Sequence, residues 1–368
     1  MAQFLRLDAS SPWRKLVGIG GIGTGIFFAF DDPHTLGRNE SRPARLLDVR
    51  DYCKLHIVIH YMAKLLGAQK SGSPFHIIPI GKVGNDARGR QLLKEMVEAG
   101  IDTSRVWMTE EKPTLFSVCF QYPDGSGGNI TTSNSAAAAL CERDLDAVAD
   151  ILDSEAKQAI ALVLPEVPLE VRRHFLDLAT RADTFRAGSF VSAEIAAARE
   201  SGFFDLLDLV SLNESEAVEL VGAPFSADAP EPFLQRCQDF IGTSNPNLRM
   251  IVSAGALGAW GLTSELLDYC PAPKVCVASS AGAGDALLAG VLAAMAAGVP
   301  FLRPRASEQR PSNGPLETAL DLSVLLASYT CLSLHTIHPD ASLSNLVEFA
   351  RSLDLTLGSG LQQFFTES

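Results

Sequence analysis

A turn of small residues that ends in a single acid is the stretch of the sequence best suited to chemistry. Residues 281–285 read Ala-Gly-Ala-Gly-Asp, and residues 286–297 favour a helix. Residues 274–277 favour a β-strand before the turn. We expect the positive end of the helix dipole and the open backbone amides of the turn to bind an anion such as phosphate. These amides belong to Gly282, Ala283 and Gly284.

Asp285 is the one ionisable side chain of this turn. An acid placed inside an anion site is also placed to accept a proton, which suits general-base chemistry. The alternative is a Gly-rich turn in which an acid simply complements the helix dipole. The turn alone does not separate these two interpretations.

The composition limits the classes of partner. The 368 residues include 30 basic and 43 acidic side chains, a net charge of −13, and the sequence has no basic run. We therefore expect a small-molecule substrate rather than nucleic acid or a membrane. Seven cysteines without CxxC spacing, and a start without the apolar run of a signal peptide, predict reduced thiols and a cytoplasmic protein.

The elements around the turn alternate between strand and helix. An apolar share of 47% supports a large core, and we predict an α/β fold with a mostly parallel sheet and helices on both faces. Residues 114–122 and 129–132 should form a hairpin around a Gly-rich turn. The other predicted strands are 15–22, 75–80, 159–164, 183–186, 207–212, 249–253 and 274–277, and helices are predicted at 56–66 and 87–99.

Two further patterns suggest chemistry but have plainer explanations. Residues 18–23 fit GxGxxG, yet a dinucleotide site needs a helix directly after the glycines, and residues 26–30 favour a strand. His56 and His60 share one helix face, but no glutamate lies between them as in a metalloprotease. We expect a structural role for both histidines.

Four motifs in order make the chain resemble the ribokinase-like sugar kinases, the phosphofructokinase-B family. Residues 80–89, followed by 99–103, look like the first signature of that family, and 212–217 look like its Asn-x-x-Glu motif. Residues 253–258 look like its nucleotide-side glycine turn, and 281–285 look like its second signature. Together the motifs span most of the chain.

The resemblance implies a fold and a set of roles. The fold would be a three-layer α/β/α sandwich, one domain over 1–368, with a small β-lid from segments near 26–50 and 112–135. Asp285 would be the general base, and Gly282, Ala283 and Gly284 would form the anion hole. ATP would lie against Ser253, Gly255 and Gly258, and Mg²⁺ would be ordered by Asn213 and Glu216 through water. A homodimer through the lid is a further expectation.

Asn213 and Glu216 also have a purely structural interpretation. Asn followed three residues later by Glu is the pattern of a helix N-cap with a capping box. Both interpretations can hold at once.

The substrate end of the family pattern is altered. The usual Asp after the first strand is replaced by Gly25, and residues 51–58 lack the usual Gly-Gly turn and Asn. Residues 279–281 replace the usual Asp-Thr-Thr, so potassium activation is not predicted. Candidate replacement contacts, chosen by position alone, are Asp31, Asp32, Arg50, Asp51, His56 and Asn134.

Two functions follow from this mixture. The first is an ATP-dependent kinase that phosphorylates a hydroxyl of a sugar-like or nucleoside-like molecule in an unusual pocket. The alternative is a non-catalytic relative that keeps the fold and binds a ligand or nucleotide.

Overall fold

A nine-stranded sheet forms the centre of the protein, here a computed structural model that describes residues 3–71, 73–124, 126–153, 156–303 and 314–366. Its strands are β1 (Lys15–Ile19), β4 (His76–Gly84), β5 (Val106–Thr109), β8 (Ala159–Val163), β9 (Phe185–Ser189), β10 (Leu209–Asn213), β11 (Arg249–Ser253), β12 (Ala259–Leu262) and β13 (Leu267–Cys270). They lie in the order β13-β12-β11-β10-β9-β8-β1-β4-β5. All neighbours from β11 to β5 are parallel, and only β12 and β13 pair antiparallel.

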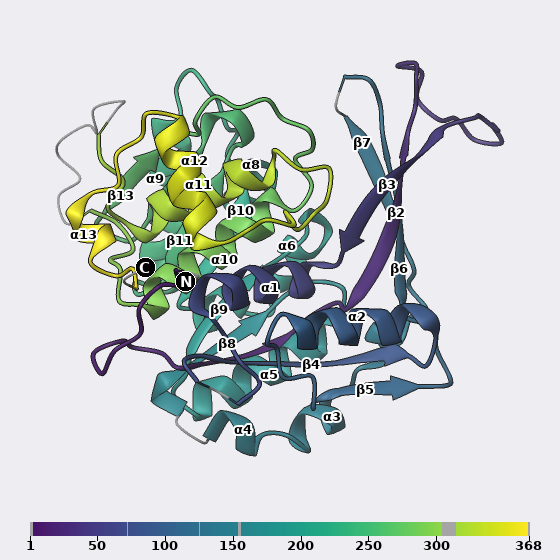
Figure 1. Ribbon diagram of the computed structural model, residues 1–368, viewed down its shortest axis with the longest axis horizontal. Coiled ribbons are helices and arrows are strands. Elements are labelled where there is room, and N and C mark those ends of the chain that lie inside the picture. The colour runs from purple at the N-terminus through teal and green to yellow at the C-terminus, as the bar shows by residue number, and fades with distance from the viewer. Residues whose placement is uncertain (1–2, 72, 125, 154–155, 304–313, 367–368) are drawn as a thin grey trace.

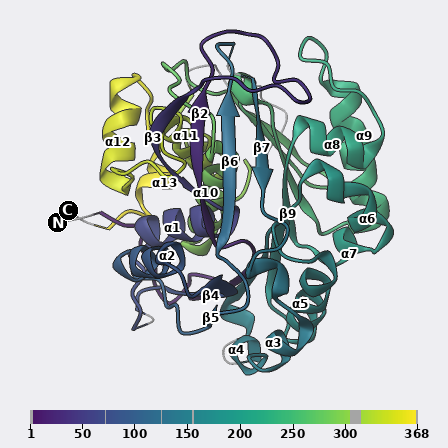
Figure 2. The ribbon, with the colours of Figure 1, turned by 90° about the vertical axis from the view of Figure 1, so that its right-hand side faces the viewer.

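Helices cover both faces of this sheet, because its strands are apolar on both sides. Successive residues point to opposite faces: Leu16 belongs to one buried cluster and Val17 to the other. The first face carries α1 (Lys54–Leu66), α2 (Ala87–Glu98), α10 (Ala283–Ala296), α11 (Ala319–Thr330), α12 (Leu343–Ser352) and α13 (Ser359–Gln362). The second carries α3 (Glu142–Asp146), α4 (Asp150–Asp153), α5 (Leu169–Arg181), α6 (Ile195–Glu200), α7 (Phe203–Leu206), α8 (Glu214–Val221) and α9 (Glu231–Ser244). The predicted three-layer α/β/α fold is confirmed (Figure 2).

Helix α10 lies between α1 and α11 and is apolar all round, as a fully enclosed helix must be. Gly290 lets α11 approach closely, because a Cβ there would lie 2.7 Å from the Cα of Ser323. None of the described helices is long and apolar enough to cross a membrane. The helix is therefore a rigid core element, and its N-terminus holds the acid of the 281–285 turn in place.

A second, smaller sheet projects from one side of the body (Figure 1). Its strands, in the order β3-β2-β6-β7, are β3 (Arg45–Tyr52), β2 (Gly23–Ala29), β6 (Leu115–Gln121) and β7 (Gly127–Thr131). The predicted hairpin is β6 with β7, and residue 125 of its turn lies outside the described residues. Because β2 rather than a helix follows the GxGxxG pattern, the chain does not form the dinucleotide motif.

Asp86 braces the small sheet against the body. Its carboxylate caps α2 by accepting the Gly89 amide at 2.8 Å, and it also accepts the Thr114 amide and hydroxyl, both at 2.8 Å. Thr114 directly precedes β6. The motif at residues 80–89 therefore has a structural function: it fixes the start of a small-sheet strand to the end of β4.

The predicted strand at 274–277 is wrong. These residues form neither helix nor strand, and Val277 is 60% exposed. β13 already occupies the edge of the large sheet, and the next amides, of Ala278 and Ser279, donate instead to the carbonyl of Cys331. The 281–285 turn therefore follows an irregular segment tied to α11.

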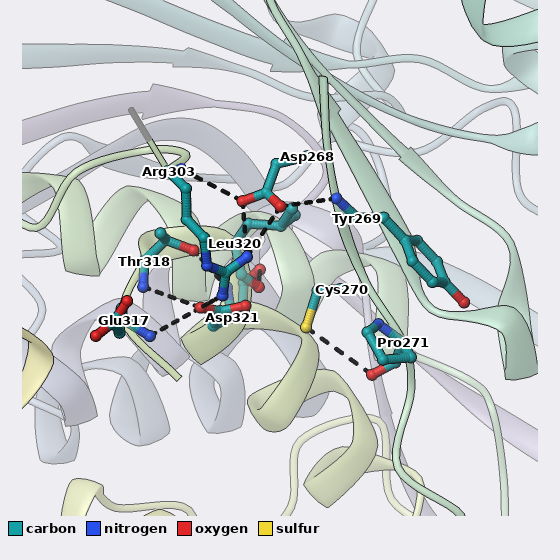
Figure 3. A network of polar contacts seen from close by, with 10 residues as sticks. Asp268, Tyr269, Cys270, Pro271, Arg303, Glu317, Thr318, Leu320 and Asp321 are labelled. Atoms are coloured by element: carbon teal, nitrogen blue, oxygen red, sulfur yellow. Dashed lines mark hydrogen bonds and ion pairs between the residues drawn. The ribbon is translucent and has the colours of Figure 1, made fainter. Parts of the chain in front are cut away.

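An ion-pair network fixes the antiparallel edge of the large sheet (Figure 3). Arg303 lies 2.9 Å from Asp268 of β13 and 2.5 Å from the fully buried Asp321 of α11. Asp321 also accepts the amides of Glu317 and Thr318 at 2.8 and 3.1 Å. One carboxylate thus joins the start of α11 to the sheet edge through Arg303.

Candidate active site

The turn at residues 281–285 contains Gly282, which has the left-handed backbone angle φ 82° and directly precedes α10. Only glycine fits here, because a Cβ would lie 2.3 Å from the carbonyl oxygen of Thr336. Gly284 differs, since a Cβ there would meet no atom within 4 Å. The turn is therefore packed on the Gly282 side and open on the Gly284 side.

One detail of the turn differs from the sequence expectation. The Ala283 amide donates to the carbonyl of Ser280 at 3.2 Å, and the Ala286 amide donates to Gly282 at 2.8 Å. The first bond closes the turn and the second begins the helix. The amide of Ala283 is thus engaged within the turn itself rather than fully open to a ligand.

Asp285 faces an unexpected partner, Lys54, at the first position of α1. The Nζ–Oδ1 distance is 3.5 Å, and the Asp285 side chain is only 11% exposed. Burial raises the pKa of Asp285, and the charge of Lys54 opposes that rise. The Lys54 pKa is raised, mainly by Asp285 and less by Glu166 and Glu216. The ammonium group favours the ionised carboxylate, which is the form that can accept a proton.

Lys54 was not among the predicted site residues, although one local signal points to it. A cation is unfavourable at a helix N-terminus, yet α1 has no acid in its first turn to compensate. Its N-cap, Cys53, makes no side-chain capping bond. A lysine in that position needs an anionic partner from elsewhere in the fold.

Glu166 is a second residue that the sequence interpretation missed. It follows β8 with the left-handed φ of 76°, uncommon for a residue with a side chain, and it accepts the Lys54 amide at 3.3 Å. Burial raises its pKa to about 7, against the opposing charge of Lys54. A Cβ at Gly21 would lie 2.2 Å from its Oε2. An acid directly after a buried parallel strand is the signal, because such strand ends line ligand crevices.

The glycine turn at residues 253–258 lies on the other side of the site. β10 and β11 end side by side at Asn213 and Ser253, which are partners in register. Gly255 and Gly258 have φ of 52° and 104°, and a Cβ at Gly258 would lie 2.1 Å from the Cys270 carbonyl oxygen. The turn therefore requires glycine at both positions.

A cavity of about 720 Å³ joins the two glycine turns. Its size suits a nucleotide-sized ligand. Lys274, in the segment wrongly predicted as a strand, adds a cation that the sequence interpretation did not use. The predicted residues on its wall are Asn213, Ser253, Gly255, Gly258, Gly282, Ala283, Gly284 and Asp285, together with Lys54.

Asn213 and Glu216 form the capping box. Asn213 Oδ1 accepts the Glu216 amide at 2.8 Å, and Glu216 Oε2 accepts the Asn213 amide at 2.9 Å. Within the described residues, no three His, Cys, Asp or Glu side chains gather into a metal cluster. Mg²⁺ keeps several waters and needs only one or two carboxylates besides phosphate, so this donor set fits a water-mediated magnesium site.

None of the predicted substrate contacts lines this cavity. Asp31 and Asp32 pair with Arg45 and Arg42 at 2.9 and 2.5 Å in the segment joining β2 to β3. His56 is fully buried against Tyr52, with ring centroids 4.5 Å apart, and burial lowers its pKa far below the usual range. The cavity wall does not include Asp31, Asp32 or His56. Arg50 and Asn134 are exposed and do not line it either.

Asp51 and Gly25 differ from the other candidates. Although neither lines the 720 Å³ cavity, they are cross-strand partners in the small sheet, and a Cβ at Gly25 would lie 2.1 Å from Asp51 Oδ2. Asp51 is 7% exposed, and its pKa is raised to about 6, mainly by burial and in part by Asp285. Of the predicted acceptor contacts, Asp51 is therefore the acid that is both buried and within the field of Asp285.

Comparisons with known proteins agree with this geometry. Residues 65–342 match the sequence profile described as "pfkB family carbohydrate kinase". No curated protein sequence matches the chain significantly.

Solved structures with the same fold share little sequence. A ribokinase from Giardia lamblia is 14% identical, with a TM-score of 0.74 over 91% of this chain and 99% of that one. An E. coli protein described as a ribokinase II, in complex with ATP and Mg²⁺, is 17% identical, with a TM-score of 0.68 over 92% and 99%. A ribokinase from Cryptococcus neoformans in complex with ADP is 16% identical, with a TM-score of 0.65 over 91% and 99%. The chain belongs to the pfkB family of carbohydrate kinases.

Proposed function

We propose that the protein is an ATP-dependent kinase that transfers the γ-phosphoryl group to a hydroxyl of a sugar-like or nucleoside-like molecule. One observation carries the proposal: a buried carboxylate, Asp285, lies beside the Lys54 ammonium in a glycine-lined cavity at a helix N-terminus. Phosphoryl transfer needs positioning and charge neutralisation more than covalent help. The cavity offers both.

The chemistry divides among a few residues. Asp285 accepts the proton as the acceptor oxygen attacks the γ-phosphorus; the new O–P bond forms, the bond to the β-phosphate oxygen breaks, and ADP leaves. The amides at Gly282 and Gly284, with Lys54, would stabilise the charge on the transferring group. The turn at Gly255 and Gly258 would hold the nucleotide.

Glu216 and Asn213 would order Mg²⁺ through water. The ion would neutralise charge on the phosphates when bound.

The small sheet would serve as the lid over the acceptor. It projects from the body beside the N-terminus of α1, where β3 ends at Tyr52 and the helix begins at Lys54 (Figure 1). Closing it would exclude water from the reacting groups. The homodimer through this sheet stays a prediction, to be checked by analytical ultracentrifugation.

The test is a screen for ADP release with ATP, Mg²⁺ and a panel of sugars, nucleosides and polyols. For an accepted substrate, Asp285→Asn should lower kcat by roughly 10²–10⁴-fold. ADP should still raise the melting temperature of that variant, because the nucleotide turn is untouched. Unchanged turnover in Asp285→Asn would refute the assignment of the base.

The non-catalytic alternative predicts a different result. It predicts a nucleotide-dependent rise in melting temperature with no acceptor-dependent ADP release from any member of the panel. The altered acceptor-side residues, Gly25 and residues 51–58, are the observation that keeps this alternative in the test.

A further inference from the structure

The side chain of Asp51 fills the space beside Gly25, its cross-strand partner in the small sheet. They face each other in the β2–β3 pair, and the carboxylate of Asp51 occupies the place that a side chain at Gly25 would need. Any side chain at Gly25 would displace that carboxylate, since the Cβ would lie 2.1 Å from Oδ2. At this place in the small sheet the acid therefore belongs to β3, as Asp51, and not to β2, where the residue is Gly25.

The Asp51 carboxylate is poorly satisfied by the protein. Among the described residues its donors are the Cys119 thiol, with Sγ 3.6 Å from Oδ2, and the backbone amide of Tyr52, which also donates to the Thr336 hydroxyl at 3.0 Å. A thiol is a weak donor, whereas a carboxylate at 7% exposure needs strong ones to offset its lost hydration. A ligand hydroxyl would satisfy it better.

Asp51 is also close to the reacting groups along the chain. It stands three positions before Lys54, whose ammonium group contacts Asp285 at 3.5 Å. Its carboxylate lies within the electrostatic reach of Asp285. A molecule that presents one hydroxyl to Asp285 could present another to Asp51.

We infer that Asp51 binds a second hydroxyl of the acceptor, and that the acceptor is an uncharged polyol rather than one already bearing phosphate or carboxylate. This inference rests on the proposed kinase function. Glu166 and Asp285 contact Lys54 through its amide and its ammonium group, and Asp51 lies three positions before Lys54, so three acids gather at the start of α1. An anionic acceptor would be repelled, while hydroxyl groups would donate to these carboxylates.

The first experiment uses Asp51→Asn, with Asp48→Asn as the matched control on the exposed part of the same strand. ADP release is measured with D-fructose, D-ribose and adenosine as neutral probes and fructose 6-phosphate as the anionic probe. Asp51→Asn should raise the KM of a neutral acceptor by roughly 10-fold or more, the size expected for losing a hydrogen bond to a charged group. The KM of ATP in Asp51→Asn should stay at the wild-type value, and so should all kinetic constants of the Asp48→Asn control.

The second experiment moves the acid back across the strands. The double variant Gly25→Asp/Asp51→Gly moves the carboxylate from β3 to β2. Its acceptor KM should be lower than that of the single variant Asp51→Gly, which has no carboxylate at either position. This variant also decides the case if Asp51→Asn fails to fold. A purely structural Asp51 would instead change the melting temperature and both KM values together.

Three results would overturn the inference. They are an unchanged acceptor KM in Asp51→Asn, equal rises in the KM of ATP and acceptor, and a wild-type preference for fructose 6-phosphate over fructose. Absence of any turnover would count against the kinase function, and calorimetric titration of the neutral probes then decides the inference separately. Binding to the wild type that weakens in Asp51→Asn would support it, and no binding to the wild type would overturn it.

Discussion

Replacing Lys54 by methionine should change how Asp285 ionises. The two charged groups are 3.5 Å apart, and at an effective dielectric constant near 20 their attraction is about 5 kcal/mol. That energy is an upper bound on how strongly Lys54 favours the ionised form of Asp285. Lys54 is 33% exposed, and solvent screening reduces the attraction to roughly 1–3 kcal/mol.

The pH profile of kcat/KM measures this shift. Loss of the ammonium raises the pKa of Asp285 further, so the general base becomes protonated at higher pH. The acidic limb of the profile should therefore move to higher pH in Lys54→Met. Lys64→Met, near the other end of α1, is the matched control and should leave the limb in place.

One result would refute this reasoning. If Lys54→Met lowers kcat equally at all pH values and leaves the acidic limb unmoved, Lys54 does not set the ionisation of Asp285. Its role would then be confined to contact with the transferring phosphoryl group.

Three further predictions concern stability and the turn. Gly282→Ala should lower the free energy of unfolding, measured by urea titration, by at least about 2 kcal/mol, because Gly282 has a positive φ and its Cβ would clash with the Thr336 carbonyl. Gly284→Ala has room for its Cβ, so it should unfold like the wild type but bind ADP more weakly in calorimetry. The pKa of Glu166 is near 4.5 in the unfolded chain, and burial raises it to about 7 in the folded protein. The free energy of unfolding should therefore fall by up to about 3 kcal/mol as the pH rises from 4.5 to 7. In Glu166→Gln the free energy of unfolding should depend less on pH over this range, and an unchanged slope would contradict the assignment. Asp321→Ala should cost roughly 3–5 kcal/mol, because Arg303 and two amides lose a buried partner; a loss below 1 kcal/mol would show that the network is dispensable.

The fold and the two glycine turns that line the cavity could be predicted because their signals are local. Gly282 and Gly258 mark backbone conformations that only glycine adopts easily, and Asp285 stands three positions after Gly282. The alternation of apolar strands with helices predicts a parallel sheet with two covered faces. These features need no knowledge of distant contacts.

The contacts of Lys54 and Asp51 could not be predicted, because these residues meet their partners only in the folded chain. Lys54 and Asp285 are 231 positions apart, and Asp51 meets Gly25 through strand pairing rather than sequence spacing. Residues 274–277 have β-favouring side chains, yet they pair with no strand, and the amides that follow them bond to the carbonyl of Cys331 beyond α11. Partner availability is a property of the whole sheet, which composition does not reveal.

Thr336 lies between the small sheet and the 281–285 turn. Its amide donates to Arg50 at 3.2 Å and its hydroxyl accepts the Tyr52 amide at 3.0 Å, so it is fastened to β3. Its carbonyl oxygen occupies the space that a Cβ at Gly282 would take. A swing of β3 must therefore either break these two bonds or press on the turn where the phosphoryl group would bind. An opening movement of the small sheet would therefore also disturb the 281–285 turn, because Thr336 contacts both.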